Sequence, residues 1–427
     1  MPDGIEPGVA TLRDPATIRE RCANITRAVE AGGSAHFTLD RERLDDVSRR
    51  VAALTRERFA DLSKIPLHSR WRHFEAGGIA RRAELDALLT GRSAVAAARA
   101  RIDLALVSVL LDAGAGPRWS YREAATGQRH ARSEGLAVAS FRAFMDGAFS
   151  SDPGDPYRVD AAALRAFDEA RLATIFQVDA GNPLVGLAGR AALLNRLGDA
   201  LRARPQTFTA TGQPGHLLDA LTLHPHAPHF KPGTHRVQPA TMHHEVSAAR
   251  LLGLLLDAFS AIWPSGQRLG SSPIGDVWPH PAAGGKGPSA GRVPFHKLSQ
   301  WLAYSLIDPF ESAGVAVTGL DALTGLPEYR NGGLFIDAGV IVPRDPAFAT
   351  RSRLPGDEWV VEWRSLTVTL LDDLAPRVRN ELGATAEVLP LVRLLEGGTW
   401  AAGRQIAAEM RPGGAPPLAI ESDGTVF

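Results

Sequence analysis

Cysteine is almost absent from this 427-residue chain, because Cys22 is the only one. A single thiol can form neither an intramolecular disulfide nor a cysteine-based zinc site, so we expect a protein of a reducing compartment. Lysine is also scarce, and only Lys64, Lys231, Lys286 and Lys297 stand among the 47 Lys and Arg residues. Since arginine is so common here, an isolated arginine says little about function.

An excess of one charge sign is also missing, since 47 Lys+Arg balance 47 Asp+Glu. Surfaces that bind polyanions normally carry a basic excess, so we expect no nucleic-acid partner. A small phosphorylated ligand stays open, because one local cluster of cations would suffice. The longest apolar runs, such as "LALVSVLL" from Leu104, are far shorter than the ~20 residues of a membrane span, and the N-terminus lacks a basic-then-apolar signal pattern. We expect a soluble, cytoplasmic protein with no membrane partner.

Helical periodicity dominates the sequence. Asp14 and Pro15 form a cap and a favoured first-turn proline for a helix over residues 16–31, and the segment 118–134, with "ATGQ" in its middle, predicts a β-hairpin. The fold class predicted is mainly α with minor β. We expect one domain over 1–427, with lobes at 1–205 and 244–427 joined by a loop rich in His and Pro, and with the candidate site between the lobes.

That loop holds seven of the thirteen histidines, between residues 216 and 244. Zinc sites need three or four ligands fixed by a rigid scaffold. Here the histidines are scattered among prolines, and "HHE" lacks the HExxH spacing. The sequence therefore predicts a solvated loop, no metal site and no cofactor.

Two stretches of the N-terminal half carry candidate ligand contacts. In "HSRWRHFEAGG", Arg70, Arg72 and His73 surround aromatic side chains and could hold a phosphate; the alternative is a surface loop anchored by Trp71. In "LLDAGAGP", Asp112 ends an apolar helix before two glycines that would let a ligand approach. A glycine C-cap of the helix explains the same pattern without a ligand.

Two predicted helices of the C-terminal half add further candidates. In "VPFHKLSQWLAYSL", Lys297 and Gln300 lie on one face at three-residue spacing and could contact an anion or a hydroxyl, unless this is simply an outer polar face. In "VVEWRSLTVTLLDDL", Glu362 and Arg364 lie at the head of a helix. An acid at this position also suits the helix dipole.

The densest polar stretch is "GLPEYRNGGLFID", with Glu328, Tyr329, Arg330 and Asn331 directly before Gly332-Gly333. One interpretation is a tight hairpin at the two glycines that presents the four side chains as a site. The other is an exposed connection between two helices that happens to be polar.

Together these five motifs resemble the uracil-catabolism family of bacteria and fungi, long described as a domain of unknown function. The resemblance covers nearly the whole chain. It implies a pathway in which uracil becomes a ribonucleotide and its ring is opened, and it implies that this member acts downstream, where a ribosylurea species releases urea. The His-rich stretch matches no motif of the family.

The pair of motifs around Lys297-x-x-Gln300 and Glu328-Tyr329-Arg330 is similar to those of queuosine-salvage N-glycosidases, whose fold is like that of helix–hairpin–helix glycosylases. That likeness implies a helix–hairpin–helix-like C-terminal part and hydrolysis of an N-ribosyl bond. Glu328 replaces an aspartate of that family, and its side chain is one methylene longer.

From this resemblance we expect Glu328 to be the catalytic carboxylate, with Arg330 or Glu362 supplying a proton to urea. We expect a 5′-phosphate to be held by Lys297 with Arg70, Arg72 or His73. The other substrate contacts expected are Gln300, Tyr329, Asn331, Asp112 and Arg364. The alternatives are an amidohydrolase that acts on a ureido intermediate and a non-catalytic binding protein of the same pathway.

Overall fold

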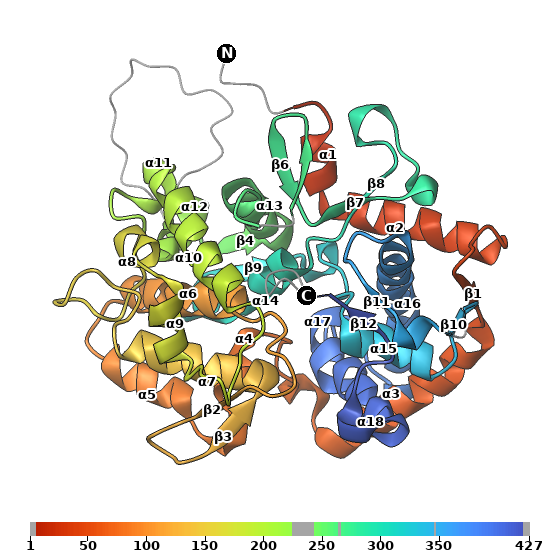
Figure 1. Ribbon diagram of the computed structural model, residues 1–427, viewed down its shortest axis with the longest axis horizontal. Coiled ribbons are helices and arrows are strands. Elements are labelled where there is room, and N and C mark those ends of the chain that lie inside the picture. The colour runs from red at the N-terminus through yellow and green to blue at the C-terminus, as the bar shows by residue number, and fades with distance from the viewer. Residues whose placement is uncertain (1–5, 224–242, 264–265, 346, 422–427) are drawn as a thin grey trace. The chain divides into compact units, whose positions relative to one another are not determined.

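The structure is a computed structural model that describes residues 6–223, 243–263, 266–345 and 347–421 (Figure 1). Within these ranges the chain is mainly helical, as predicted, and every sheet is a pair of short strands. In the same part of the chain, no helix is long and apolar enough to cross a membrane.

The chain folds into two compact units. Unit 1 comprises residues 1–68, 265–304 and 320–427, and unit 2 comprises residues 69–264 and 305–319. The sequence suggests two continuous lobes, at 1–205 and 244–427, whereas the units interleave along the chain. A loop-rich stretch shows where the chain is irregular, but the apolar faces of distant helices decide which elements pack together.

Helices from both ends of the chain build unit 1. They are α1 (Val9–Arg13), α2 (Pro15–Glu30), α3 (Leu44–Arg58), α15 (Tyr329–Asp337), α16 (Glu358–Leu382), α17 (Leu391–Leu394), α18 (Trp400–Met410) and the beginning of α14 (Lys297–Ser312). Shorter turns are η1 (Arg41–Arg43), η2 (Leu62–Lys64), η5 (Pro281–Ala283), η6 (Gly287–Ser289), η7 (Leu320–Ala322), η8 (Phe348–Thr350), the π-helical η9 (Leu395–Thr399) and η10 (Pro412–Gly414). Helix α2 begins where the sequence predicts, because Oδ1 of Asp14 accepts a 2.9 Å hydrogen bond from the Ala16 N–H.

Short strand pairs tie the segments of unit 1 together. The antiparallel pairs are β1 (Phe37–Leu39) with β10 (Ile341–Pro343), β5 (Gln267–Leu269) with β6 (Ser272–Gly275), and β7 (Val277–Pro279) with β8 (Arg292–Pro294). The parallel pair is β11 (Ser352–Arg353) with β12 (Ala419–Ile420). The β7–β8 ladder fixes both ends of the loop 280–291, which borders the two cavities described below.

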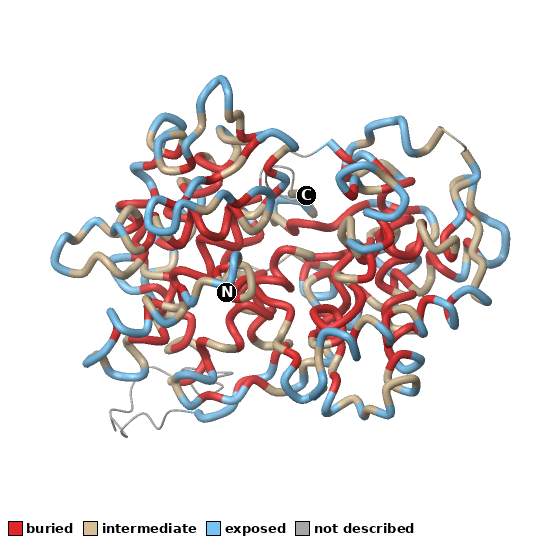
Figure 2. The backbone as a smooth tube through the Cα atoms, turned by 90° about the horizontal axis from the view of Figure 1, so that it is seen from below, coloured by how far each residue is buried: buried red, intermediate tan, exposed pale blue. Residues whose placement is uncertain are grey.

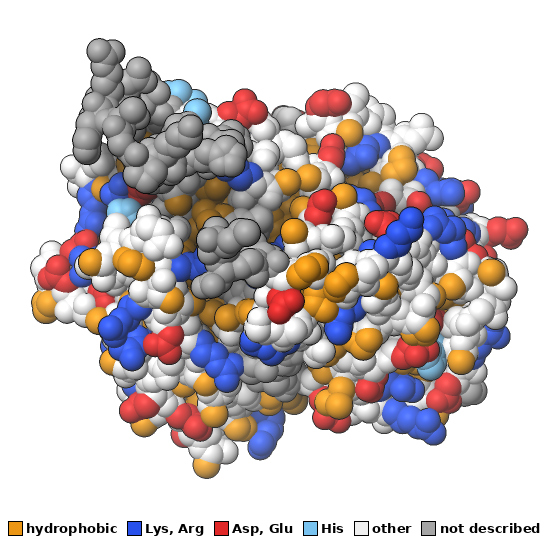
Figure 3. Space-filling model, turned by 90° about the horizontal axis from the view of Figure 1, so that it is seen from above, with side chains coloured by type: hydrophobic (Ala, Val, Ile, Leu, Met, Phe, Trp, Pro, Cys, Tyr) orange, Lys and Arg blue, Asp and Glu red, His pale blue; other side chains and the backbone are white. Residues whose placement is uncertain are grey.

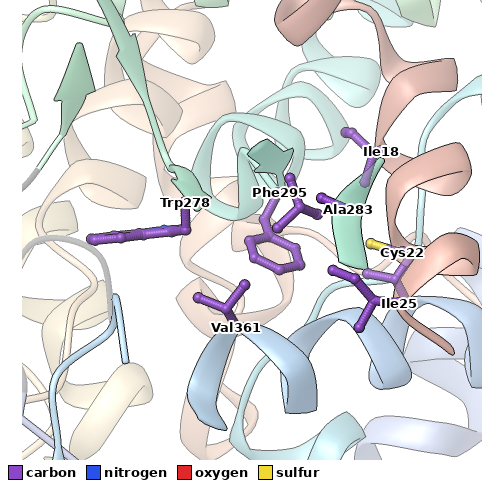
Figure 4. Close-up of a cluster of buried hydrophobic side chains, with 9 residues drawn as sticks. Ile18, Cys22, Ile25, Trp278, Ala283, Phe295 and Val361 are labelled. Atoms are coloured by element: carbon purple, nitrogen blue, oxygen red, sulfur yellow. The ribbon is translucent and has the colours of Figure 1, made fainter. Parts of the chain in front are cut away.

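A buried apolar cluster joins α2, α16 and the loop 280–291 (Figure 4). Its labelled members are Ile18, Cys22 and Ile25 from α2, Trp278 from β7, Ala283 from η5, Phe295, and Val361 from α16. Helix α16 packs against both α2 and α3. Apolar burial contributes roughly 25 cal/mol per Å², so this cluster stabilises the packing of α2 and of the loop 280–291 against α16.

Unit 2 is helical with two strand pairs. Its elements are α4 (Arg70–Phe74), η3 (Ala76–Gly78), α5 (Arg81–Leu88), α6 (Ala94–Leu110), α7 (Arg132–Met145), α8 (Ala161–Arg165), α9 (Glu169–Ile175), α10 (Leu187–Arg202), α11 (Pro205–Phe208), η4 (Pro214–His216), α12 (Leu217–Thr222), α13 (Ala248–Phe259) and the end of α14. Strands β2 (Ser120–Arg122) and β3 (Arg129–Ala131) form the hairpin that the sequence predicts. Strands β4 (Glu245–Ser247) and β9 (Ala316–Thr318) pair in parallel.

Burial follows the helices in both units. Helix α6 contains the apolar run noted in the sequence, and its last turns are buried on all sides. Figure 2 shows buried residues along the helices and exposed residues mainly in the connections. On the face shown in Figure 3, acidic and basic side chains are interspersed, which agrees with the balanced composition.

Candidate functional site

A cavity of about 240 Å³ in unit 1 is lined by residues of α2, of the segment that follows it, of the loop 280–291 and of the beginning of α16. Its apolar wall is formed by Ile25, Ala28 and Val29 of α2. Its polar groups are the side chains of Ser34, His280, Glu358 and Glu362. The cavity thus sets two carboxylates, an imidazole and a hydroxyl against an apolar wall.

The carboxylate of Glu362 is buried and its hydrogen bonds have a defined direction. The hydroxyl oxygen of Ser34 accepts backbone N–H groups from His36 and Phe37, each at 2.9 Å. Its proton therefore points to Oε1 of Glu362, with which it forms a hydrogen bond. Oε1 of Glu362 is therefore the acceptor of this bond, and its Oε2 is left for another partner.

His280 presents an N–H group to the same carboxylate. Its Nδ1 accepts a 3.2 Å hydrogen bond from the Ala282 N–H. In the neutral ring the proton is therefore on Nε2, which lies 3.6 Å from Oε2 of Glu362. The His280 side chain is only 4% exposed, and its Nε2 has no hydrogen-bond partner among the described residues. A buried donor thus faces a buried acceptor across a gap slightly too long for a bond.

The sequence predicts no metal site, yet the structure gathers three side chains that could hold an ion. Ligand atoms of His280, Glu358 and Glu362 all lie within 4.8 Å of one another. Metal-bound histidines usually donate their second N–H to an acceptor, whereas here Nδ1 of His280 is itself the acceptor. A ligating Nε2 would require that bond with Ala282 to break. The hydrogen-bond pattern therefore favours an acid–base pair over a metal centre.

Glu328, the carboxylate expected to be catalytic, caps helix α15. Its Oε1 accepts the Asn331 N–H at 2.7 Å and its Oε2 accepts the Arg330 N–H at 2.8 Å. Capping of this kind satisfies two N–H groups that have no partner within the helix. Both oxygens of Glu328 therefore have a structural use.

The hairpin expected at Gly332-Gly333 is wrong, because both glycines lie inside α15. A Cβ atom on Gly332 would lie 2.3 Å from the indole of Trp363, so this glycine permits close packing of α15 on α16. In the same way, a Cβ on Gly403 would lie 2.0 Å from the carbonyl oxygen of Arg330. The glycines serve helix packing instead of a turn.

The other side chains of this segment also have partners inside unit 1. The Asn331 side chain donates to the carbonyl of Leu326 at 3.1 Å and accepts from the Thr399 hydroxyl at 2.8 Å. Arg330 donates to the carbonyl of Gly414 at 3.0 Å. Burial, with a smaller contribution from Glu328, raises the pKa of Tyr329 to about 12.

Gln300 and Lys297 begin helix α14. Gln300 is fully buried, donating to the Phe295 carbonyl at 2.9 Å and accepting from the Thr324 N–H at 2.8 Å. The face that carries it also contains the buried Trp301, so it is not an outer polar face. The backbone N–H of Lys297 donates to Asp276 at 3.0 Å.

Arg364 forms a buried ion pair with Asp276. The two terminal guanidinium nitrogens of Arg364 each lie 2.7 Å from a carboxylate oxygen of Asp276. Burial alone raises the pKa of Asp276, but the charge and hydrogen bonds of Arg364 outweigh it and hold that pKa below its ordinary value. This pairing gives Arg364 a structural role that its sequence neighbours do not indicate.

The candidates from the N-terminal half lie in unit 2. Arg70 is fully buried, and its guanidinium lies 2.8 Å from Asp112, so the structure brings these two together as an ion pair. Arg72 lies 3.3 Å from Glu75, and His73 is half-buried on α4. Lys297, expected to hold a phosphate together with one of these residues, belongs to unit 1.

Sequence reasoning misses Ser34 and His280. They come from segments far from Glu362 along the chain, so no spacing connects them. Most of the His-rich stretch 216–244, expected to be a solvated loop, lies outside the described residues; at its beginning, Nδ1 of His216 lies 2.8 Å from Asp219.

Comparison with known proteins gives a consistent result. Residues 11–427 match the family model described as "Protein of unknown function (DUF1688)". The chain is 37% identical over 452 residues to "Uracil catabolism protein 4" of Lachancea kluyveri, covering 99% of this chain and 100% of that protein. It is also 37% identical over 431 residues to "Protein urg3" of Schizosaccharomyces pombe, covering 98% and 99%. These matches confirm the resemblance drawn from the five motifs, and the chain belongs to the DUF1688 family.

Proposed function

We propose that this protein acts in uracil catabolism and hydrolyses the N-ribosyl bond of a ribosylurea-type nucleotide, with release of urea. The pathway is suggested by the name of the Lachancea kluyveri relative. The observation that carries the reaction is the buried carboxylate of Glu362, whose Oε1 is held by Ser34 and whose Oε2 faces the Nε2–H of His280 at 3.6 Å.

Glu362 fits the part of general base better than Glu328 does. Glu362 lines the cavity, and its Oε2 can take a proton from a water molecule that attacks C1 of the ribose. The negative charge of the carboxylate also stabilises the positive charge that develops on the sugar as the C1–N bond breaks. Ser34 keeps the carboxylate in this orientation throughout.

His280 fits the part of a hydrogen-bond donor to the leaving group. When the C1–N bond breaks, its electron pair passes to urea, where the charge is shared between nitrogen and the carbonyl oxygen. The Nε2–H of His280 can donate to that oxygen, since its Nδ1 is engaged by the Ala282 N–H. Glu362 then returns to the urea nitrogen the proton that it took from water, so that the net reaction consumes one water molecule.

The test compares two isosteric changes at the two candidate carboxylates. Glu362→Gln removes the base, so the single-turnover rate of urea release from ribosylurea 5-phosphate should fall by about 10²–10⁴-fold with little change of affinity. Glu328→Gln keeps a capping acceptor, so it should lower the free energy of unfolding by about 1 kcal/mol and leave the rate nearly unchanged.

Three other outcomes would contradict this proposal, and each would support a different alternative. A large rate loss in Glu328→Gln with an unchanged melting temperature would return the catalytic role to Glu328. Ammonia instead of urea as the first product would indicate the amidohydrolase alternative. If the purified wild-type protein releases neither product but binds the nucleotide, the non-catalytic alternative holds.

A further inference from the structure

A second cavity of unit 1, of about 400 Å³, is bordered by other residues of the same loop 280–291 that borders the first. It is lined by Thr11, Glu20, Arg21, Gly285, Lys286 and Ser289. We propose that this cavity binds a phosphoryl anion, which is held by the Arg21 guanidinium and by Lys286 of the glycine-rich loop.

Arg21 is a buried cation with too few acceptors. It is 2% exposed, its Nη1 lies 3.5 Å from the Ala283 carbonyl oxygen, and its Nε has no hydrogen-bond partner among the described residues. Oε1 of Glu20 lies 3.8 Å from that Nε, on a side chain that is 58% exposed. A guanidinium has five N–H donors, and burying a charge with so few partners is costly. The oxygens of a phosphoryl group match the planar fork of donors that Arg21 offers.

The loop opposite Arg21 is shaped by glycine. Gly284, Gly285 and Gly287 have φ of 72°, 89° and 62°, a region in which other residues are strained. A Cβ atom on Gly285 would lie 1.5 Å from Nη1 of Arg21. The loop backbone therefore lies directly on the guanidinium, and a side chain at position 285 would displace it.

Lys286 supplies a second cation at the rim. It is exposed, lies directly after the two glycines and is one of the four lysines of the chain. The hydroxyl of Ser289, which is buried, donates to the Lys286 carbonyl at 3.2 Å and so helps to hold the loop. A buried arginine and an exposed lysine that line one cavity form a cationic site within a protein of zero net charge.

Glu20 makes a specific expectation possible. Its carboxylate borders the cavity beside Arg21 and would repel a bound anion. If the cavity is an anion site, Glu20→Gln should tighten binding. If Glu20 and Arg21 are merely a structural ion pair, this substitution should have no effect on anion affinity.

The anion could be the substrate's own phosphate or free phosphate. Helix α2 carries both Arg21 and the residues Ile25 and Ala28 of the first cavity, one to two helical turns away, or roughly 6–10 Å along the axis. That the phosphate belongs to the substrate rests on the proposed function, whereas the anion site itself rests only on the contacts above.

The experiment is calorimetric titration of the full chain with inorganic phosphate. Arg21→Met and Lys286→Met should each weaken binding, Arg21→Met by about 10- to 100-fold, the range of a charge-assisted bond, and Glu20→Gln should tighten it. The matched controls are Arg27→Met, an exposed arginine of the same helix, and Lys64→Met, an exposed lysine of unit 1; both should bind like wild type.

Binding that is unchanged in Lys286→Met and in Glu20→Gln, or no binding of phosphate to the wild type at millimolar concentration, overturns the site. Lys286 is exposed, so its variant remains a valid test even if Arg21→Met fails to fold. Competition between phosphate and ribosylurea 5-phosphate would identify the substrate's phosphate as the ligand. Simultaneous binding of both would identify free phosphate instead. These readouts measure binding only, so they stand whether or not the proposed hydrolysis is found.

Discussion

Glu123 of unit 2 shows how much a single buried side chain can contribute. It is fully buried, and it accepts hydrogen bonds from Arg81 at 2.8 Å, Thr126 at 2.7 Å and Arg142 at 2.6 Å. Burial raises the pKa of this carboxyl, but the hydrogen bonds and the charge of Arg81 outweigh it and lower the pKa from 4.5 to about 2. The folded state therefore favours the ionised form more strongly than the unfolded state does.

The sign of the pH dependence follows from that lowered pKa. The stabilisation is fully present above about pH 4.5, where the carboxyl is ionised even in the unfolded chain, and it is lost as the pH falls toward 2. Glu123→Gln should lower the free energy of unfolding at pH 7 by about 3 kcal/mol. Urea unfolding at pH 7 and at pH 3 should show a much smaller difference from wild type at pH 3.

Glu84→Gln is the matched control, because Glu84 also pairs with Arg142 but its side chain is 40% exposed. Ion pairs of this exposure contribute about 0–1 kcal/mol. Two outcomes would contradict the lowered pKa of Glu123. One is an equal loss of unfolding free energy in both variants, and the other is a loss in Glu123→Gln that is as large at pH 3 as at pH 7.

At the scale of the element, helix α15 shows what the sequence can and cannot predict. The composition of residues 325–337 marks a dense polar segment, but a Gly-Gly pair fits a turn or a close helix contact equally well. The choice depends on Trp363, which lies on another helix and which sequence spacing cannot place beside Gly332. The same limit explains Arg364, whose partner Asp276 lies far away in the chain.

Two alanine substitutions in α15 test this packing. Replacing a helical glycine by alanine gains up to about 1 kcal/mol from propensity, but a Cβ on Gly332 would lie 2.3 Å from the Trp363 indole. Overpacking of this kind costs about 1–3 kcal/mol, so Gly332→Ala should be destabilising. At Gly333 the nearest atom is Pro417 Cδ at 3.1 Å, so Gly333→Ala should be nearly neutral. The measurement is the melting temperature of each variant. If Gly332→Ala melts at the same temperature as Gly333→Ala, or at a higher one, the close packing at Gly332 is contradicted.

At the scale of the whole molecule, periodicity and turn residues suffice to predict a mainly α protein and its hairpin, and five motifs suffice to predict its family. The interleaved units and the two cavities cannot be predicted this way. Glu362 is recognisable as a candidate, since it stands in a motif, but its importance depends on Ser34 and His280, which reach it only through tertiary packing. Arg21 is hidden for another reason, because arginine is abundant and only its burial makes it unusual.

If Ser34, His280 and Glu362 form one catalytic unit, their substitutions should not be additive. Ser34→Ala removes a hydrogen bond to a charged group, about 1.5–3 kcal/mol, so the single-turnover rate should fall about 10- to 100-fold. In the background of Glu362→Gln, where no charge is left to orient, the same substitution should change the rate by less than about 3-fold. Glu328→Gln provides the control, because its small effect should be the same in both backgrounds. Full additivity of Ser34→Ala with Glu362→Gln would show that the hydroxyl acts independently of the carboxylate, and the chain of hydrogen bonds proposed for the cavity would then not be the catalytic arrangement.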